Sequence, residues 1–292
     1  MPIYILSVDV EDYFHVQAFA KTVDRKHWDR YSTRVEANTK HLLDFLDGQA
    51  VHATFFVLGW VAERYPGLVR EIALRGHELA CHSYWHRLIF DLTPKEFRED
   101  TRRAKQLVED AAGVAVCGYR APSFSITERT TWAWQTLAET GFTFSSSVFP
   151  IYHDIYGYPT APRTPFEVMT PSGPIREYPL TTFNIRNHNM PVGGGGYLRL
   201  FPFWYTRLGV RRSQKDSLPL VTYVHPWEFD PDQPRLQGSF LSRARHYTNL
   251  RRTEPRLARL LQMGDFRPFK DSGIEALAHA HPFPLHGALQ YA

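Results

Sequence analysis

The alternation of short apolar runs with helix-forming segments is the feature that most constrains how this chain can fold. Apolar runs of the length of buried strands occupy residues 3–8, 53–58, 77–81, 117–119 and 142–144. Segments with helical spacing of apolar residues separate them at 39–46, 61–74, 94–112 and 127–139. Strands that alternate with helices in this way predict an α/β protein built on a parallel sheet or barrel.

The rest of the chain follows a different pattern. Residues 150–196 are rich in proline, glycine and aromatic residues, which predicts an elaborated loop region with a turn at 171–174 between two short strands. Residues 218–223 read as the last core strand, and residues 241–261 as a long amphipathic helix.

These patterns predict one main domain with an extension. The main domain spans residues 1–230 and contains the loop insertion at about 150–196. Residues 231–292 form a C-terminal helical extension that packs on the same domain.

Charge and hydropathy narrow the partners and the location. The net charge is only +4, from 34 basic and 30 acidic residues that are interleaved, so no nucleic-acid footprint is expected. The basic stretch at 243–259 fits either a solvated helix face or an anionic membrane surface. The first residues carry acidic side chains instead of a signal peptide, and no apolar run reaches the length of a membrane span. We therefore expect a cytoplasmic protein, with peripheral membrane contact left open.

Polar residues with catalytic chemistry follow the predicted strands. They are Asp9, Glu11 and Asp12, then His82 and His86, then Arg120, and finally His225. Because ligands bind at the carboxyl ends of parallel strands, these side chains should meet in one site. A carboxylate and two imidazoles leave open positions on Zn²⁺ or a similar ion, where a water molecule becomes a nucleophile. The combination indicates a metal hydrolase.

No single motif in this set is specific. His82 and His86 lie four residues apart, a spacing that brings both rings to one face, but the chain has 14 histidines and chance pairs are common. The three acidic residues by themselves fit a helix N-cap equally well. Their order along the chain carries the prediction.

Four ordered motifs, SVDVEDYF, RGHELACHSYWH, GYRAPSF and YVHP, resemble those of the polysaccharide deacetylases, carbohydrate esterase family 4. The resemblance runs from about residue 3 to residue 226. Further runs resemble the branch associated with exosortase (PEP-CTERM) exopolysaccharide loci: SSSVFP at 145–150, PVGGGGYLRL at 191–200 and HYTNLRRTEPRLARLL at 246–261. This resemblance implies a distorted (β/α) barrel with fewer than eight strands.

The resemblance also implies catalytic roles. Asp9 matches the catalytic base, and Arg120 matches the arginine that orients it. His225 matches the general acid, and Val224 would help to form the pocket for the acetyl methyl group. The aspartate often found in the fourth motif is replaced around Ser145, so the group that tunes His225 must come from elsewhere.

One divalent metal ion is expected, with Zn²⁺ as the first choice and Co²⁺, Ni²⁺ or Mn²⁺ as alternatives. His82 and His86 match the metal-binding histidines. The family usually has two adjacent aspartates, whereas this chain has Asp9-Val-Glu-Asp, so the carboxylate ligand is ambiguous. We favour Asp12 for its shorter side chain, while strand alternation would select Glu11.

The substrate side of the site is expected in the third motif. Backbone groups of Pro122, Ser123 and Phe124 are the predicted oxyanion donors.

The predicted function is hydrolytic N-deacetylation of N-acetylated amino sugars in an exopolysaccharide or its precursor. A glycan is the expected partner, and contact with membrane-bound polysaccharide machinery is left open. One alternative is an amidohydrolase of small cyclic amides, allantoinase-like or a cyclic imidase, on the same scaffold. Another is a catalytically silent glycan-binding protein.

Overall fold

Seven parallel strands form the centre of the molecule in the computed structural model, which describes residues 2–153, 156–279 and 282–283. In spatial order they are β10 (Leu220–Val224), β1 (Tyr4–Val10), β2 (Thr54–Val57), β3 (Glu78–Cys81), β4 (Gly118–Tyr119), β5 (Phe144–Ser145) and β7 (Gly173–Glu177). The α/β fold and its parallel sheet are therefore confirmed. The parallel series has fewer than eight strands, as predicted.

Short strands extend this series. β6 (Phe166–Thr170) pairs antiparallel with β7 across the predicted turn, β12 (Pro282–Phe283) pairs with β6, and β11 (Phe266–Arg267) pairs with β1. β8 (Thr182–Ile185) and β9 (His188–Pro191) form a separate hairpin. The region predicted as an elaborated loop thus contains four strands, two more than expected.

A loop brings the two ends of the parallel series together. Within the described ranges, no strand ladder joins β10 to β7 or β6. Instead, Thr181, which follows β7, donates its backbone N–H to the carbonyl of Val221 at 3.4 Å. Val221 donates its own N–H to Oγ1 of Thr181 at 2.6 Å. These two hydrogen bonds connect the ends of the series through a loop, and strand pairing closes no barrel among the described residues.

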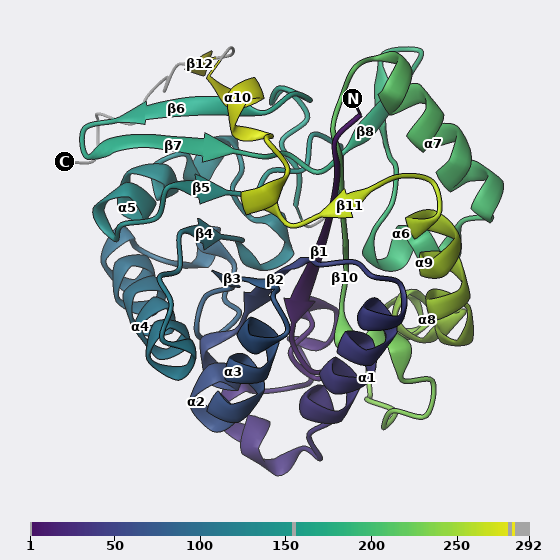
Figure 1. Cartoon of the computed structure of the whole chain (residues 1–292). Coiled ribbons are helices and arrows are strands. Elements are labelled where there is room, and N and C mark those ends of the chain that lie inside the picture. The colour runs from purple at the N-terminus through teal and green to yellow at the C-terminus, as the bar shows by residue number, and fades with distance from the viewer. Residues whose placement is uncertain (1, 154–155, 280–281, 284–292) are drawn as a thin grey trace.

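Helices cover the outside of the first strands, as Figure 1 shows. They are α1 (Val35–Gly48), α2 (Gly59–Arg64), α3 (Pro66–Leu74), α4 (Pro94–Ala112) and α5 (Ala133–Glu139). The predicted start of α4 is present as a capping box, in which Thr93 and Glu96 satisfy each other's backbone N–H. The predicted helix over 61–74 is broken at Pro66, which lacks an N–H and begins a new helix instead.

The C-terminal helices gather near β10 and β11 (Figure 1). They include α6 (Gly195–Leu200), α7 (Phe203–Lys215), α8 (Phe240–Tyr247) and α9 (Thr253–Leu261), and α10 (Glu275–Ala278) lies near β6 and β7. The helix predicted over 241–261 is two helices, because Asn249 adopts a left-handed φ of 60° between them. In the part of the chain that the structure describes, no helix has both the length and the apolar character that a membrane span requires.

The basic stretch at 243–259 is partly used inside the protein. Nη1 of Arg256 donates to the carbonyls of Leu198, Arg199 and Phe201 at the end of α6. Arg251 and Arg252 are exposed. The arginines of this stretch are therefore not one continuous surface feature.

Side chains along β1 alternate between two faces, and one of these faces leads to the functional site. Leu6, Val8 and Val10 pack in the main core, whereas Ile5 belongs to a second apolar cluster. On the face of Ile5, Ser7 and Asp9 follow at every second position and are polar and buried. The interior of the barrel thus changes from apolar to polar toward the carboxyl end of β1.

Candidate active site

A buried arginine holds the carboxylate of Asp9. Nη1 of Arg120 donates to Oδ1 of Asp9 at 2.7 Å and to Oγ of Ser7 at 2.8 Å. Nε and Nη2 of Arg120 donate to the carbonyl and the hydroxyl of Ser146, both at 3.0 Å. Because charge-assisted hydrogen bonds on three sides fix the guanidinium, the orientation of Asp9 is fixed as well. The contact predicted between Asp9 and Arg120 is present.

Glu11, His82 and His86 form a buried cluster that could hold a metal ion. One ligand atom from each side chain lies within 4.8 Å of the others. Glu11 follows β1, and both histidines follow β3, so the cluster lies at the carboxyl ends of two neighbouring strands. Nδ1 of His82 lies 2.9 Å from the carbonyl oxygen of Arg120. A proton on Nδ1 would leave Nε2 of His82 free for a metal.

The unsatisfied atoms and charge states of the cluster fit a divalent cation. Among the described residues, Nδ1 of His86 is buried without a hydrogen-bond partner, which is uncommon for polar atoms, and Oε2 of Glu11 lies 2.9 Å from Nε2 of His86. Burial raises the pKa of Glu11, but the nearby imidazoles of His86, His225 and His82 lower it more, so the carboxylate is ionised. Burial lowers the pKa of His82 to about 4, so its ring is neutral. These are the states that bind metal.

Asp12 does not join this cluster, which corrects the preference for it as the metal carboxylate. Its Oδ2 accepts hydrogen bonds from the backbone N–H groups of Arg34 at 2.6 Å and Val35 at 2.9 Å, where α1 begins. Its Oδ1 accepts the N–H of Tyr13 at 2.9 Å. Asp12 therefore caps α1 from a distance. Glu11, the alternative, stays on the face of Asp9.

His225 follows β10 and faces the carboxylates. Its Nε2 lies 3.5 Å from Oε1 of Glu11 and 3.9 Å from Oδ2 of Asp9. Its Nδ1 lies 2.5 Å from Oε1 of Glu228, in the short helix η6 (Pro226–Phe229). Burial lowers the pKa of His225, but the hydrogen bond and charge of Glu228, with the charges of Glu11 and Asp9, raise it above its ordinary value. This environment favours the proton-carrying imidazolium.

Glu228 is a residue that the sequence reasoning missed. It lies next to Nδ1 of His225, where the missing aspartate near Ser145 left the partner unidentified. A signal was present, because Glu228 follows His225 by three residues, the spacing of a capping box. Its own partner, Arg199, gave no signal, since the contact joins segments 29 residues apart.

The residue of β10 that lines the site is the neighbour of the one predicted for the methyl pocket. Val224 is completely buried in the main core and does not line the cavity of the site. Tyr223 lines this cavity. The alternation of side chains along β10 places Tyr223 on the same face as His225, so the period of two should have selected it.

Of the three residues predicted to donate a backbone N–H to the oxyanion, one keeps a candidate donor. Residues 122–124 form the short helix η4 (Pro122–Phe124). Pro122 has no backbone N–H, and the N–H of Phe124 donates to the carbonyl of Ala121 at 3.0 Å. Ser123, which lines the cavity, is thus left as the candidate donor among these three residues.

The candidate metal ligands meet Asp9, His225, Tyr223 and Ser123 in a cavity of about 200 Å³ at the carboxyl ends of the strands. Its lining includes Asp9, Glu11, His82, His86, Ser123, Phe124, Tyr156, Tyr223, His225 and Trp227. The cavity thus combines a candidate metal centre, a fixed carboxylate and a charged imidazole with aromatic walls. Fold and site together define an α/β protein with a candidate hydrolytic centre at the carboxyl end of its parallel sheet.

Two protein families have models that match this chain. Residues 19–145 match the model of the polysaccharide deacetylase family, and residues 146–272 match a domain of unknown function (DUF3473). This part of the chain is therefore similar to the polysaccharide deacetylase family, as the motifs predicted. The first match includes His82, His86 and Arg120, whereas His225 and Glu228 lie in the second and Asp9 and Glu11 precede both.

Curated relatives match over a limited part of the chain. Peptidoglycan-N-acetylglucosamine deacetylase of Bacillus cereus is 34% identical over 90 residues, which are 31% of this chain and 33% of the relative. Chitooligosaccharide deacetylase of a Bradyrhizobium species is 33% identical over 78 residues, which are 27% of this chain and 36% of the relative. The matched segments thus span only about a third of these relatives.

The fold has a similar solved structure over nearly its whole length. The crystal structure of a candidate polysaccharide deacetylase from Mycobacterium smegmatis superimposes with a TM-score of 0.65 and covers 97% of this chain and 93% of its own. The two sequences are 20% identical, so this likeness supports the fold alone.

Proposed function

We propose that this protein is a metal-dependent deacetylase that hydrolyses the N-acetyl group of an amino sugar in a glycan. The observation that carries the proposal is the placement of Asp9 and His225 beside the cluster of Glu11, His82 and His86. The named deacetylase relatives support the substrate class. The resemblance of the motifs further suggests an exopolysaccharide or its precursor as the glycan. Contact with membrane-bound polysaccharide machinery stays a prediction of the sequence.

The residues divide the reaction between them. Glu11, His82 and His86 would hold a divalent ion, with Zn²⁺ as the first choice, which when bound polarises the amide carbonyl and acidifies a water molecule. Asp9, oriented by Arg120, takes the proton from the attacking water through Oδ2. Nε2 of His225 gives a proton to the leaving amine, and the N–H of Ser123 supports the carbonyl oxygen as negative charge develops.

Acetate release tests this proposal directly. Purified protein is incubated with N-acetylglucosamine oligomers and with crude exopolysaccharide, before and after chelation, and Zn²⁺ or Co²⁺ is then added back. We expect acetate that disappears on chelation and returns with the metal, because the three ligands alone cannot activate water. Protein that carries metal but releases no acetate from any glycan would overturn the proposal.

Two variants test the assigned roles. Asp9→Asn and His225→Ala should each lower turnover by roughly 100-fold or more, since each removes a proton-transfer group. Metal content, measured by mass spectrometry, should stay near that of the unmodified protein, because neither residue is a proposed ligand. Turnover retained in both variants would contradict the assignment.

A further inference from the structure

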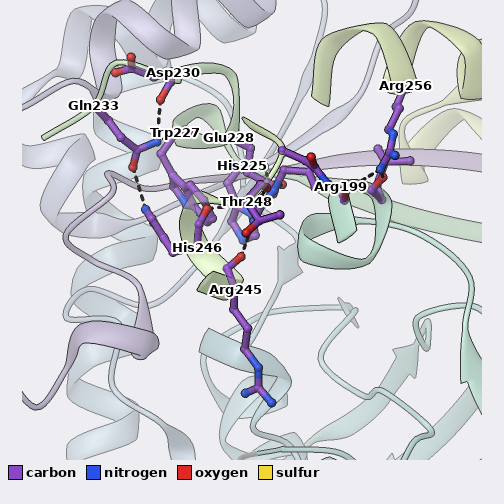
Figure 2. Close-up of polar contacts among 12 residues, drawn as sticks. Arg199, His225, Trp227, Glu228, Asp230, Gln233, Arg245, His246, Thr248 and Arg256 are labelled. Carbon is purple, nitrogen blue, oxygen red and sulfur yellow. Dashed lines mark hydrogen bonds and ion pairs between the residues drawn. The ribbon is translucent and has the colours of Figure 1, made fainter. Parts of the chain in front are cut away.

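A line of buried charged groups leads away from the active-site cavity behind His225. Nδ1 of His225 contacts Oε1 of Glu228 at 2.5 Å, and Oε2 of Glu228 accepts a hydrogen bond from Nε of Arg199 at 2.6 Å. Glu228 is 0% exposed and Arg199 is 1% exposed. Figure 2 shows Arg199, Glu228 and His225 in this arrangement. Arg199 does not line the cavity, and Glu228 links it to His225.

The guanidinium of Arg199 is held by backbone carbonyls from another part of the chain. Nη1 donates to the carbonyls of His246 at 3.1 Å and Thr248 at 2.8 Å, and Nη2 donates to the carbonyl of Arg245 at 3.3 Å. These three carbonyls lie at the end of α8 and just after it. With the bond to Glu228, all three guanidinium nitrogens are engaged, so the guanidinium has a fixed position (Figure 2).

The helix that carries Arg199 is anchored in turn. Nη1 of Arg256 donates to carbonyls at the end of α6, including that of Arg199 at 2.5 Å, and Nδ2 of Asn249 donates to the same carbonyl at 3.0 Å. The end of α6 would otherwise leave carbonyls without partners. Arg256 comes from α9, so two arginines fasten α6 to the segment that follows α8.

Because Glu228 is completely buried, its carboxylate needs the charge of Arg199 to stay ionised. A completely buried carboxylate with no cationic partner would be strongly destabilised and would take up a proton. Burial raises the pKa of Glu228, but the charges of Arg199 and His225 lower it more, to below its ordinary value. An ionised Glu228 carboxylate can only accept hydrogen bonds, so its contact with His225 favours a proton on Nδ1 of that ring. It therefore selects the tautomer and ring orientation that direct Nε2 toward the cavity.

We propose that Arg199 is a positioning residue for the deacetylation reaction, which acts through Glu228 to fix the orientation and tautomer of His225. The inference rests on the proposed function, in which His225 protonates the leaving amine. It also gives residues 146–272, the domain of unknown function, a role in the reaction. They supply His225, Glu228 and Arg199, and the helices that hold them in place.

Steady-state kinetics with a matched control test the proposal. Arg199→Met should lower kcat for acetate release from N-acetylglucosamine oligomers by roughly tenfold or more, with KM within about twofold, because substrate binding is untouched while the acid is misoriented. Arg199→Lys should recover part of the loss, since it keeps the charge beside Glu228. Arg75→Met is the control, because Arg75 is likewise held by carboxylates, three in number, but is partly exposed and lies outside the cavity. A kcat for Arg199→Met equal to that of the control would overturn the proposal.

A second variant guards against simple misfolding. Removal of both charges, in the double variant Arg199→Met with Glu228→Gln, avoids an unpaired buried charge and should preserve the melting temperature better than Arg199→Met. We expect the double variant to fold and still to have low kcat. Full activity in this folded variant would show that the pair is only structural.

A spectroscopic measurement separates this proposal from the proposed function. Nitrogen chemical shifts of His225 are recorded by NMR on metal-loaded protein labelled at histidine, at a pH high enough for the ring to be neutral. They report its tautomer without any turnover. We expect the Nδ1–H form of His225 in the unmodified protein and in Arg75→Met, and a mixture of tautomers in the folded double variant. An unchanged tautomer there would overturn the positioning role. If the unmodified protein releases no acetate but the tautomer of His225 changes in the double variant, only the deacetylase assignment is overturned.

Discussion

At the residue scale, two neighbouring acidic side chains have separate tasks. Glu11 lies with His82 and His86 in the candidate metal cluster. Asp12 is bonded to three backbone N–H groups near the start of α1. Their positions differ by one residue, so strand alternation favours Glu11 on the face of Asp9 but does not show what Asp12 contacts. The path of the backbone after β1 does, because it directs the side chains to different neighbours.

Substitution of each acid should therefore affect a different property. Glu11→Ala should abolish tight metal binding and acetate release, because it removes the anionic ligand. Asp12→Ala should lower the free energy of unfolding by roughly 1 to 3 kcal/mol, because the N–H groups of Arg34 and Val35 at the start of α1 lose their acceptor. Metal titration and thermal unfolding of both variants check this. Loss of metal binding in folded Asp12→Ala, with metal retained in Glu11→Ala, would reverse our assignment.

At the element scale, the start of α6 depends on glycines that pack against β10. Gly194 precedes α6 with a φ of 97°, and a Cβ atom at this position would lie 2.5 Å from Cδ1 of Tyr223. Gly195 also has a positive φ and lies against Tyr223. Tyr223 lines the active-site cavity, and α6 carries Arg199. The glycine run therefore places α6 close to the site and is not simply a flexible turn.

Alanine at Gly194 should be more harmful than alanine at a glycine with open surroundings. Gly113→Ala, at the left-handed end of α4 where a Cβ meets no atom within 4 Å, should cost about 1 to 2 kcal/mol from backbone conformation alone. Gly194→Ala adds overpacking against Tyr223, for a total of roughly 2 to 5 kcal/mol. It should also lower kcat. Denaturant unfolding and kinetics of both variants measure the difference, and equal costs would contradict the predicted contact.

At the scale of the whole molecule, the regions matched by two family models share one sheet. β10 and β7, from the second region, flank the series β1 to β5 and pair with β1 and β5. The candidate site needs both regions as well, since His225 of the second region lines the same cavity as His82 and His86 of the first. The division at residue 145 therefore does not correspond to two independent structural units.

Separate fragments should accordingly fail to fold. Residues 1–145 alone would leave β1 without its β10 partner, so they should give no cooperative thermal transition and no near-ultraviolet circular dichroism signal. Residues 146–292 should behave in the same way. The full chain should unfold in one transition, and co-expression of the two fragments is the control for their expression. A cooperative melt of either fragment by itself would refute this expectation.

Much of the fold was predictable because local rules decide it. Apolar runs and helical spacing identified the first strands and helices, and the start of α4 followed from Thr93 and Glu96. The breaks at Pro66 and Asn249 were missed, although proline is a local signal that deserved more weight. The strands between 166 and 191 were harder to predict, since their short segments depend on pairing partners.

What the sequence determined by itself is the set of chemical groups and their order along the strands. Periodicity and motif order place Asp9, His82, Arg120 and His225 at strand ends, because a parallel sheet brings those ends together. Tertiary structure alone decided which groups touch: Glu11 instead of Asp12 at the metal cluster, and Arg199 behind Glu228. The physical reason is that spacing along one strand follows from backbone geometry, whereas contacts between distant segments depend on how the whole chain packs.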